Sequence, residues 1–288
     1  MVFSSDFLKA LGIKFSKYGY IEVINKNQVH DSSYYESKNY ESRDLLKKYE
    51  KDHVYYKNYH TYLGVFLQDR LSLLDRNFTI VDFGCGVGHS VEGFKIAGYQ
   101  SYGIEVSKLA VSHSKKMLRD VRHGGMECIN SISQPNTLLY SKNVLEHIVH
   151  PETFFQSVFS SKKIDYLLIS VPNDFNPLQL KANNIVQNKF WWVDIEHHAN
   201  YFNREGLINL AKRYGFKEVF SFTTYPLELA ILSGSNYVDN KPLGRYAHKV
   251  RTNYEDLFKN YVFDIYEQQA KSNIGRDLCI CFEKIIDK

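Results

Sequence analysis

A short apolar run that ends in a cluster of glycines constrains the fold of this chain more than any other feature. Residues 78–83 form the run, residues 84–88 read Gly-Cys-Gly-Val-Gly, and residues 91–97 have a helical pattern that stops at Gly98. A strand, a glycine turn and a helix in this order are typical of the carboxyl edge of a parallel sheet, where ligands bind. The glycines let the backbone turn tightly, and the start of the helix offers free N–H groups. The sequence therefore predicts a ligand-binding loop in an α/β fold.

The spacing of the glycines discriminates between ligands. A dinucleotide site requires G-x-G-x-x-G, but His89 stands where its last glycine would lie. A phosphate-binding loop would end in Gly-Lys-Ser/Thr, which is missing here. Asp82, just ahead of the loop, would repel a pyrophosphate and suit a ligand with an ammonium group. A glycine-rich turn without a ligand is the alternative.

A second acid supports a ligand. Glu105 ends the next predicted strand, one strand–helix unit after the loop. A carboxylate at this place lies beside the first loop and can accept hydrogen bonds from two ribose hydroxyls. Without the loop, it would be interpreted as a solvated strand end.

The rest of the chain alternates between short apolar segments and helical patterns. This alternation predicts an α/β fold, a Rossmann-like doubly wound sheet with helices on both faces. We expect strands at 78–83, 101–106, 126–129, 137–141, 166–171, 217–223 and 277–282, and helices at 43–74, 91–97, 109–118, 151–159 and 206–214.

Two segments fall outside this alternation. The N-terminal one contains Tyr34, Tyr35 and Tyr40, which could stack over an adenine, although tyrosine is common throughout the chain. The segment 226–272 has apolar residues at helical spacing from Tyr254 to Ile265, which predicts a long helix. We therefore expect an N-terminal cap region (1–60), a core domain (61–225), a helical insertion that forms a substrate lid (226–272) and a last core strand (273–288).

Charge and cysteine content exclude several classes of protein. The 288 residues carry a net charge of +4, spread along the chain, which is too mild to indicate binding to nucleic acid or to a membrane surface. No apolar stretch is long enough to span a bilayer, and the first residues lack the pattern of a signal peptide. Four cysteines without a Cys-x-x-Cys pair argue against a disulfide scaffold or a zinc site. We expect a cytoplasmic protein, monomeric or homodimeric.

At the glycine loop and Glu105, the chain resembles class I S-adenosylmethionine (SAM)-dependent methyltransferases, over roughly residues 75–225 and the last strand. Three further segments resemble the small-molecule branch that includes ubiquinone-biosynthesis O-methyltransferases. They are Asn143-Val144-Leu145-Glu146-His147, Val171-Pro172-Asn173, and His198-Ala199-Asn200-Tyr201-Phe202 with the later Leu207 and Tyr214-Gly215-Phe216.

This resemblance implies a role for each matching residue and an antiparallel final strand in the sheet. Asp82 would bind the methionine ammonium of SAM, and Glu105 the ribose hydroxyls. The usual adenine-binding carboxylate after the third strand is missing, so Asn130 or Ser131 would replace it. The other cofactor-binding residues would be Gly84, Gly86, Gly88 and Asn143, and S-adenosylhomocysteine (SAH) would be the product.

The acceptor should bind at the ends of strands four and five, where several polar residues gather. We expect the catalytic candidates to be His147, Asp174, His197 and His198. A hydroxyl acceptor needs a base that removes its proton, whereas an anionic acceptor does not. Each candidate also has a structural interpretation: helix start for His147, turn or cap for Asp174, and loop anchors for the histidine pair. No catalytic metal is expected.

These observations favour transfer of a methyl group to an oxygen of a small, sugar- or phosphate-bearing acceptor. The stretch from Tyr225 to Leu229, before the insertion, resembles methyltransferases of bacterial surface-polysaccharide modification. The alternatives are a protein or nucleic-acid methyltransferase and a SAM-binding module without turnover. The Asn/Asp-Pro-Pro-aromatic and Pro-Cys motifs of DNA methylases are missing.

Overall fold

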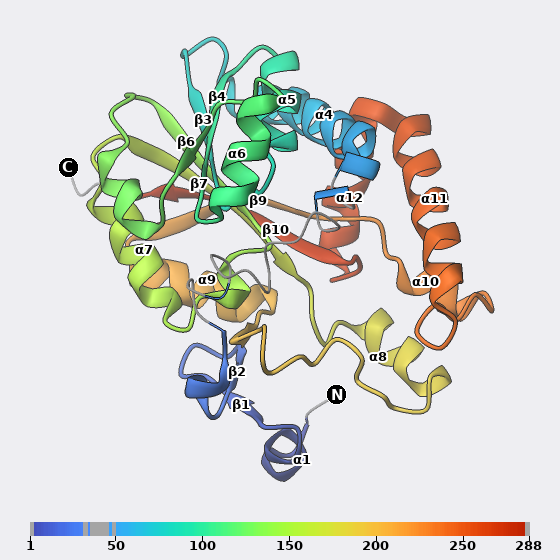
Figure 1. Cartoon of the computed structure of the whole chain (residues 1–288). Coiled ribbons are helices and arrows are strands. Elements are labelled where there is room, and N and C mark those ends of the chain that lie inside the picture. Colours follow the sequence, from blue (N-terminus) through green and yellow to red (C-terminus); the bar gives the residue numbers. More distant parts are fainter. Residues whose placement is uncertain (1–2, 31–33, 35–45, 48–49, 286–288) are drawn as a thin grey trace.

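The computed structural model describes residues 3–30, 34, 46–47 and 50–285. Its centre is a seven-stranded sheet in the order β5-β4-β3-β6-β7-β10-β9 (Figure 1). The strands span Thr79–Phe83 (β3), Gln100–Glu105 (β4), Val121–His123 (β5), Thr137–Lys142 (β6), Ile164–Pro172 (β7), Phe216–Thr223 (β9) and Asp277–Lys284 (β10). The pairs from β5 to β7 are parallel, and β10 is antiparallel to both its neighbours. The predicted fold, including the antiparallel last strand, is confirmed.

Helices cover both faces of this sheet, as its continuous apolar strands require. Pro151–Ser160 (α7) and Arg204–Arg213 (α9) pack on one face, through residues such as Phe154 and Leu207. His53–Leu71 (α4), His89–Ile96 (α5) and Val262–Lys271 (α12) pack on the other. Lys108–Lys116 (α6) contacts β4 and β5. Cys279 and Cys281 of β10 are buried in the core, as expected.

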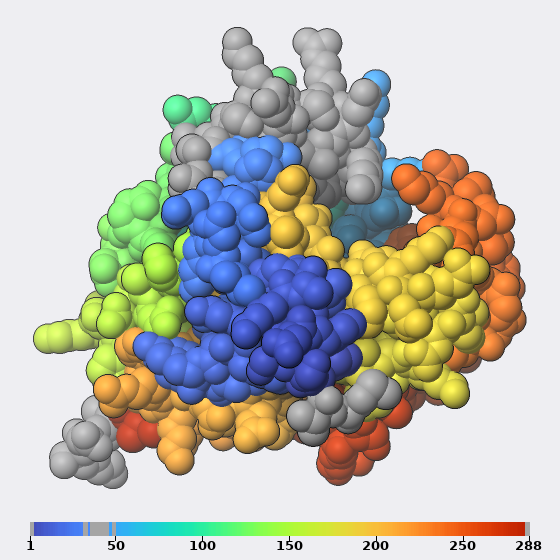
Figure 2. Space-filling model, turned by 90° about the horizontal axis from the view of Figure 1, so that it is seen from below, coloured from blue at the N-terminus to red at the C-terminus, as the bar shows by residue number. Residues whose placement is uncertain are grey.

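A second, small sheet lies below the first, and the sequence did not predict it. Ile13–Phe15 (β1) pairs with Ile21–Val23 (β2), which pairs with the distant Asn200–Tyr201 (β8). Ser5–Ala10 (α1) and a 3₁₀ turn at Lys26–Gln28 (η1) flank it. Figure 2 shows this dark-blue N-terminal segment against the yellow segment that contains Pro177–Ile185 (α8).

The third strand of the core was predicted at the wrong place. The structure has β5 at Val121–His123, whereas the predicted range forms a 3₁₀ helix at Met126–Ser131 (η2). β5 has one buried residue and two exposed ones, so it lacks the apolar run that marks a buried strand. The 3₁₀ helix buries only Ile129.

The insertion is helical, but its helix is broken. It contains Glu228–Leu232 (α10) and Lys241–Phe258 (α11), and a 3₁₀ turn at Lys259–Tyr261 (η4) separates α11 from α12. The apolar spacing from Tyr254 to Ile265 that predicted one helix therefore spans the end of α11 and the start of α12. Among the described helices, none has both the length and the apolar character that crossing a bilayer requires.

Candidate functional site

The glycine loop joins β3 to α5 and takes a shape that glycine favours. Gly84, Gly86 and Gly88 have φ angles of 78°, 55° and 77°, in the left-handed region that side chains disfavour. A Cβ atom on Gly84 would lie 2.3 Å from Cγ2 of Val144, whereas one on Gly86 would have no atom within 4 Å. The loop is thus packed against the protein at Gly84 and faces open space at Gly86.

Two buried carboxylates lie beside this loop. Burial raises the pKa of Asp82 to about 7, although the Ser90 hydroxyl donates a hydrogen bond to it. Glu105 is also buried, which raises its pKa, and it accepts hydrogen bonds from the N–H groups of Gly86 and Ser107, both at 2.8 Å. Glu105 therefore holds the loop by accepting a hydrogen bond from its backbone.

The loop and the two acids line a cavity of about 310 Å³. Its chemistry fits a ligand with an ammonium group, for Asp82, and hydroxyl groups, for Glu105. The free face of Gly86 leaves room for such a ligand to touch the backbone. These residues therefore fit the methionyl and ribose parts of SAM. His60, His89, Tyr140 and Asn143 also line this cavity.

A neighbouring, largely apolar cavity of about 460 Å³ begins at Gly84 and Val144. Its wall includes Ile104 and Met126, so it suits a flat ring such as adenine. Glu127 lines it, but Asn130 and Ser131 are exposed and line neither this cavity nor that of Asp82. The displaced third strand accounts for this difference, because the residues that follow β5 are Gly124 to Glu127.

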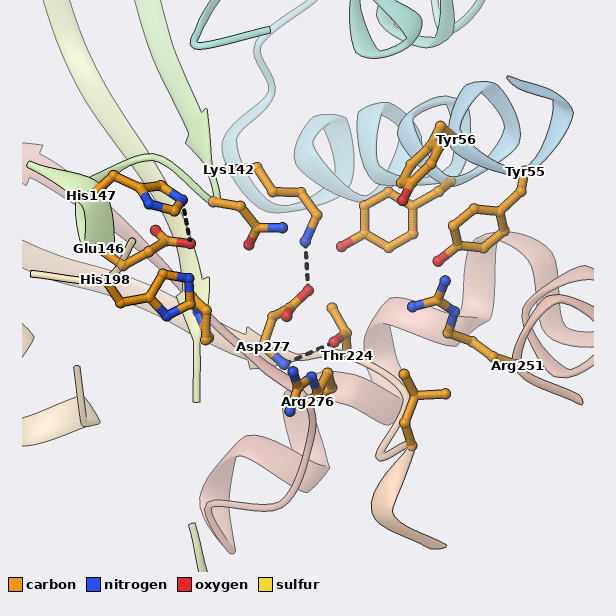
Figure 3. Close-up of a pocket in the computed structure, with 14 residues that line it drawn as sticks. Tyr55, Tyr56, Lys142, Glu146, His147, His198, Thr224, Arg251, Arg276 and Asp277 are labelled. Carbon is orange, nitrogen blue, oxygen red and sulfur yellow. Dashed lines mark hydrogen bonds and ion pairs between the residues drawn. The ribbon is translucent and has the colours of Figure 1, made fainter. Parts of the chain in front are cut away.

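A third cavity, of about 380 Å³, adjoins the cavity of Asp82, and we call it the acceptor cavity (Figure 3). It shares Tyr56, Lys142, Asn143 and His147 with the cavity of Asp82. Its other lining residues are Tyr55, Tyr59, Glu146, Pro172, His198, Thr224, Leu227, Arg251, Arg276 and Asp277. A molecule bound there would lie next to a ligand of the glycine loop.

One wall of the acceptor cavity carries Glu146, His147 and His198. Burial raises the pKa of Glu146 to about 8 and lowers that of His198 to about 4, with His147 lowering the latter further. Nδ1 of His147 lies 2.7 Å from the carbonyl oxygen of His197, so this nitrogen carries the proton and Nε2 is left as an acceptor. Nδ1 of His198 and Oε2 of Glu146 are buried without a partner in the described chain.

These three residues could also bind a cation. One ligand atom from each lies within 4.8 Å of the others. Two imidazoles and a carboxylate suit a divalent transition metal, and the bond from His147 to a backbone carbonyl is typical of metal-binding histidines. The sequence predicted no metal, and it did not single out Glu146.

The acceptor cavity also holds charged residues that were not predicted from the sequence. Lys142, at the end of β6, lies 2.5 Å from Asp277 at the start of β10. Arg276 lies 3.1 Å from the buried Glu228. Lys142 ends a strand whose other five residues are all buried, and Asp277 directly precedes the apolar run 278–282. A charged residue at the end of such a run is the signal that could have identified them.

The structure separates the other predicted catalytic residues from the cavity. His197 is half-buried and contacts Asp194 at 3.0 Å. Asp174 is buried beside Gln179, and burial raises its pKa to about 7. Neither lines the acceptor cavity. Tyr34 stacks on His30, away from the glycine loop, while Tyr35 and Tyr40 lie outside the described residues.

Comparisons with known proteins agree with this geometry. Residues 55–219 match the model of a family described as a methyltransferase domain. The chain is similar in structure to the plantazolicin methyltransferase BamL in complex with a triazolic desmethylPZN analog and SAH. Their TM-score is 0.53 at 14% identity, over 90% of this chain and 96% of that chain.

Two further solved structures are more distant. A SAM-dependent methyltransferase from Archaeoglobus fulgidus has a TM-score of 0.47 at 19% identity, over 77% of this chain and 93% of that one. Magnesium protoporphyrin IX methyltransferase from Synechocystis PCC 6803, with bound SAH, has a TM-score of 0.47 at 15% identity, over 66% and 90%. No curated protein matches the chain in sequence.

Proposed function

Because the chain belongs to the methyltransferase-domain family, whose methyl donor is SAM, we propose that it methylates an oxygen of a small polar molecule held in the acceptor cavity. The observation that carries this proposal is the wall that the acceptor cavity shares with the cavity of the glycine loop. The cavity encloses about 380 Å³, which suits a small molecule better than a protein or nucleic-acid chain.

The residues of the glycine-loop cavity would hold the cofactor. Asp82 would bind its ammonium group, Glu105 its ribose hydroxyls, and the loop backbone at Gly86 would touch it. When bound, SAM supplies a methyl group on a sulfonium, which is already a good leaving group. The protein must therefore mainly align the acceptor oxygen and manage its proton.

His198 would accept the proton of an acceptor hydroxyl. Its lowered pKa keeps the imidazole neutral at pH 7, and its buried Nδ1 has no partner among the described residues. Glu146, in the same wall, is largely protonated at pH 7 because of its raised pKa. Its carboxylate form would stabilise a positive charge on His198, so we expect kcat to rise as the pH approaches 8.

The acceptor would be a sugar- or phosphate-bearing metabolite, and surface-polysaccharide modification is the process we propose. The cavity's side chains support a polar acceptor, because hydroxyl, imidazole, carboxylate and cationic groups line it. The insertion, through Leu227 and Arg251, would form its lid.

An acceptor screen tests this function. The protein is incubated with SAM and a panel of phosphorylated sugars, nucleotide-linked sugars and phospho-metabolites, and both SAH release and the product mass are measured. We expect one class to gain a methyl group on oxygen. SAH binding without transfer to any acceptor would favour a SAM-binding module, and methylation of protein or nucleic acid alone would contradict the proposal.

Variants then test the base. His198→Asn should lower kcat by roughly 10²–10⁴-fold with SAH affinity unchanged, because a general base contributes about that much. His197→Asn should change kcat far less, since its side chain lies outside the cavity. A chelator should leave the wild-type rate unchanged. If the chelator instead abolishes activity and Zn²⁺ or Mn²⁺ restores it, then Glu146, His147 and His198 bind a metal and His198 is not the base.

A further inference from the structure

Arg251 is a half-buried cation of the acceptor cavity that the methyl-transfer chemistry does not use. It belongs to α11, in the insertion, and its guanidinium points into the cavity from the side opposite His198 (Figure 3). It lies over the ring of Tyr55, 4.6 Å from the ring centre. One end of the cavity therefore carries the imidazoles, and the other end carries Arg251.

Arg251 has N–H donors that form no hydrogen bond with a described residue. One guanidinium nitrogen lies 2.6 Å from Nδ1 of His248, and Nε is buried without a partner among the described residues. Burial and Arg251 lower the pKa of His248, so this imidazole is neutral and accepts the bond. Within the described ranges, Arg251 forms no ion pair with a carboxylate, although Glu255 lies one helical turn away.

The other cations of the cavity are already neutralised. Asp277 neutralises Lys142, and Glu228 neutralises Arg276. Glu255, the acid nearest to Arg251 on its own helix, accepts a hydrogen bond from the Tyr266 hydroxyl at 2.8 Å, and burial raises its pKa. Of these three cations, Arg251 is therefore the one that forms no ion pair with a described carboxylate, although the charge of Glu255 raises its pKa.

Withdrawing part of a guanidinium from water without an ion-pair partner is costly, because the charge loses hydration that no carboxylate replaces. A ligand with a negative group would remove this cost and fill the free N–H positions. Tyr59 strengthens this interpretation, because its hydroxyl lines the same cavity and is also buried without a partner among the described residues. Guanidinium and phenol groups both donate hydrogen bonds to oxyanions.

We propose that Arg251 binds an oxyanion of the acceptor, a phosphate or a carboxylate, while the oxygen to be methylated lies at the His198 end. The inference rests on the proposed function and narrows its substrate class. The acceptor would be a molecule with a hydroxyl at one end and an anionic group at the other. Arg251 would then determine specificity, since a neutral analogue of the acceptor would give the guanidinium no anionic partner.

Binding of simple anions tests this assignment without knowledge of the acceptor. Inorganic phosphate and acetate are titrated separately into the SAH-loaded full-length protein, and binding is measured by calorimetry. We expect saturable binding of at least one anion to the wild type, and binding roughly 10- to 100-fold weaker in Arg251→Met, because charge-assisted hydrogen bonds are lost. The anion that binds more tightly shows whether the acceptor carries a phosphate or a carboxylate.

Two further variants make the result decisive. Arg245→Met removes the same charge from an exposed position of α11 and should bind the anion as the wild type does. Arg251→Lys keeps the positive charge but loses the planar guanidinium, so it should bind the anion with an affinity between those of the wild type and Arg251→Met. If Arg251→Met does not fold, Arg251→Lys decides the test. Equal anion affinity in the wild type and the Arg251 variants, or no anion binding by the wild type, would overturn the proposal. Failure of the wild type to bind SAH would instead refute the proposed function.

Discussion

At the scale of single residues, the cofactor half of the site contains two carboxylates that are buried, and burial makes their ionised form unfavourable. Asp82 and Glu105 are 4% and 8% exposed, and burial raises both pKa values. Neither forms an ion pair with a described cation. A cationic, hydroxyl-bearing ligand would supply the missing partners, which explains why both acids tolerate burial.

Glu105→Ala should weaken SAH binding by roughly 10- to 100-fold, because charge-assisted hydrogen bonds to two ribose hydroxyls contribute about 1.5–3 kcal/mol. The loss of the bond to the Gly86 N–H adds to the effect. Calorimetry of SAH binding measures it. Asp120→Asn is the control, since Asp120 is exposed between α6 and β5. A folded Glu105→Ala protein with wild-type affinity would show that Glu105 only holds the loop.

The pKa of Asp82 predicts a pH dependence of cofactor binding. The free carboxyl has a pKa of about 7. The ammonium group of SAH would lower this pKa, so the complex holds fewer protons than the free protein, and affinity should rise with pH below about 7 and then level off. Well below pH 7, the SAH affinity should rise by about tenfold per pH unit, because one proton is released on binding. Asp82→Asn should bind more weakly and lose this slope; the same slope in the variant would assign the proton to another group.

The sequence predicted these cofactor residues because loop spacing and strand ends place them without knowledge of distant contacts. The acceptor cavity is different. Arg251 comes from the insertion and Tyr55 from α4, so only the folded chain brings them together. Glu146 lies inside a motif that predicted the family, but nothing in its neighbours indicates that its Oε2 atom is buried without a partner.

At the scale of elements, the strands β3, β4, β6 and β7 follow their sequence patterns, and the elements that were predicted wrongly or missed have local causes. β5 is too short and too exposed to show an apolar run. The small sheet has strands of two and three residues, and its outer strands are far apart in the sequence. Such pairing depends on tertiary contacts rather than on periodicity.

The packing of α4 against α5 gives a prediction at this scale. A Cβ on Gly93 of α5 would lie 2.5 Å from the carbonyl oxygen of Lys57 in α4. Gly93→Ala should therefore destabilise the protein by about 1–3 kcal/mol, despite the better helix propensity of alanine. Chemical denaturation measures the change.

Gly244 of α11 is the matched control, because its Cβ would meet no atom closer than Cβ of Tyr237, at 3.8 Å. Gly244→Ala should increase stability by about 0.5–1 kcal/mol through propensity alone. If Gly93→Ala were equally stabilising, the two helices would not be packed as closely as the structure has them.

At the scale of the whole molecule, the cofactor side and the acceptor side of the site are held by different sheets. The glycine loop extends from the large sheet, whereas His198 precedes β8 and depends on the small sheet. The backbone N–H of Val23 donates to the carbonyl of Ala199 at 3.0 Å, and that of His30 donates to Glu196 at 2.8 Å. The N-terminal segment therefore supports the loop of the proposed base, more than 150 residues away in sequence.

This division predicts that the acceptor side can be disrupted while cofactor binding survives. Val23 is fully buried in the core of the small sheet. Val23→Asp places an unpaired charge there at a cost of several kcal/mol, which should release β2 from β8. Hydrogen exchange of residues 194–201 should become faster, and methyl transfer should fall. SAH affinity should stay within about threefold of the wild type, because the glycine loop shares no partner with Val23.

The neighbouring Ile24 provides the control, because it is 46% exposed. Ile24→Asp introduces the same charge one residue further along, and it should alter neither exchange nor methyl transfer. If Val23→Asp removed SAH binding together with transfer, the two sheets would unfold as one cooperative unit, and the N-terminal segment would be part of the core rather than a separate support for the acceptor side.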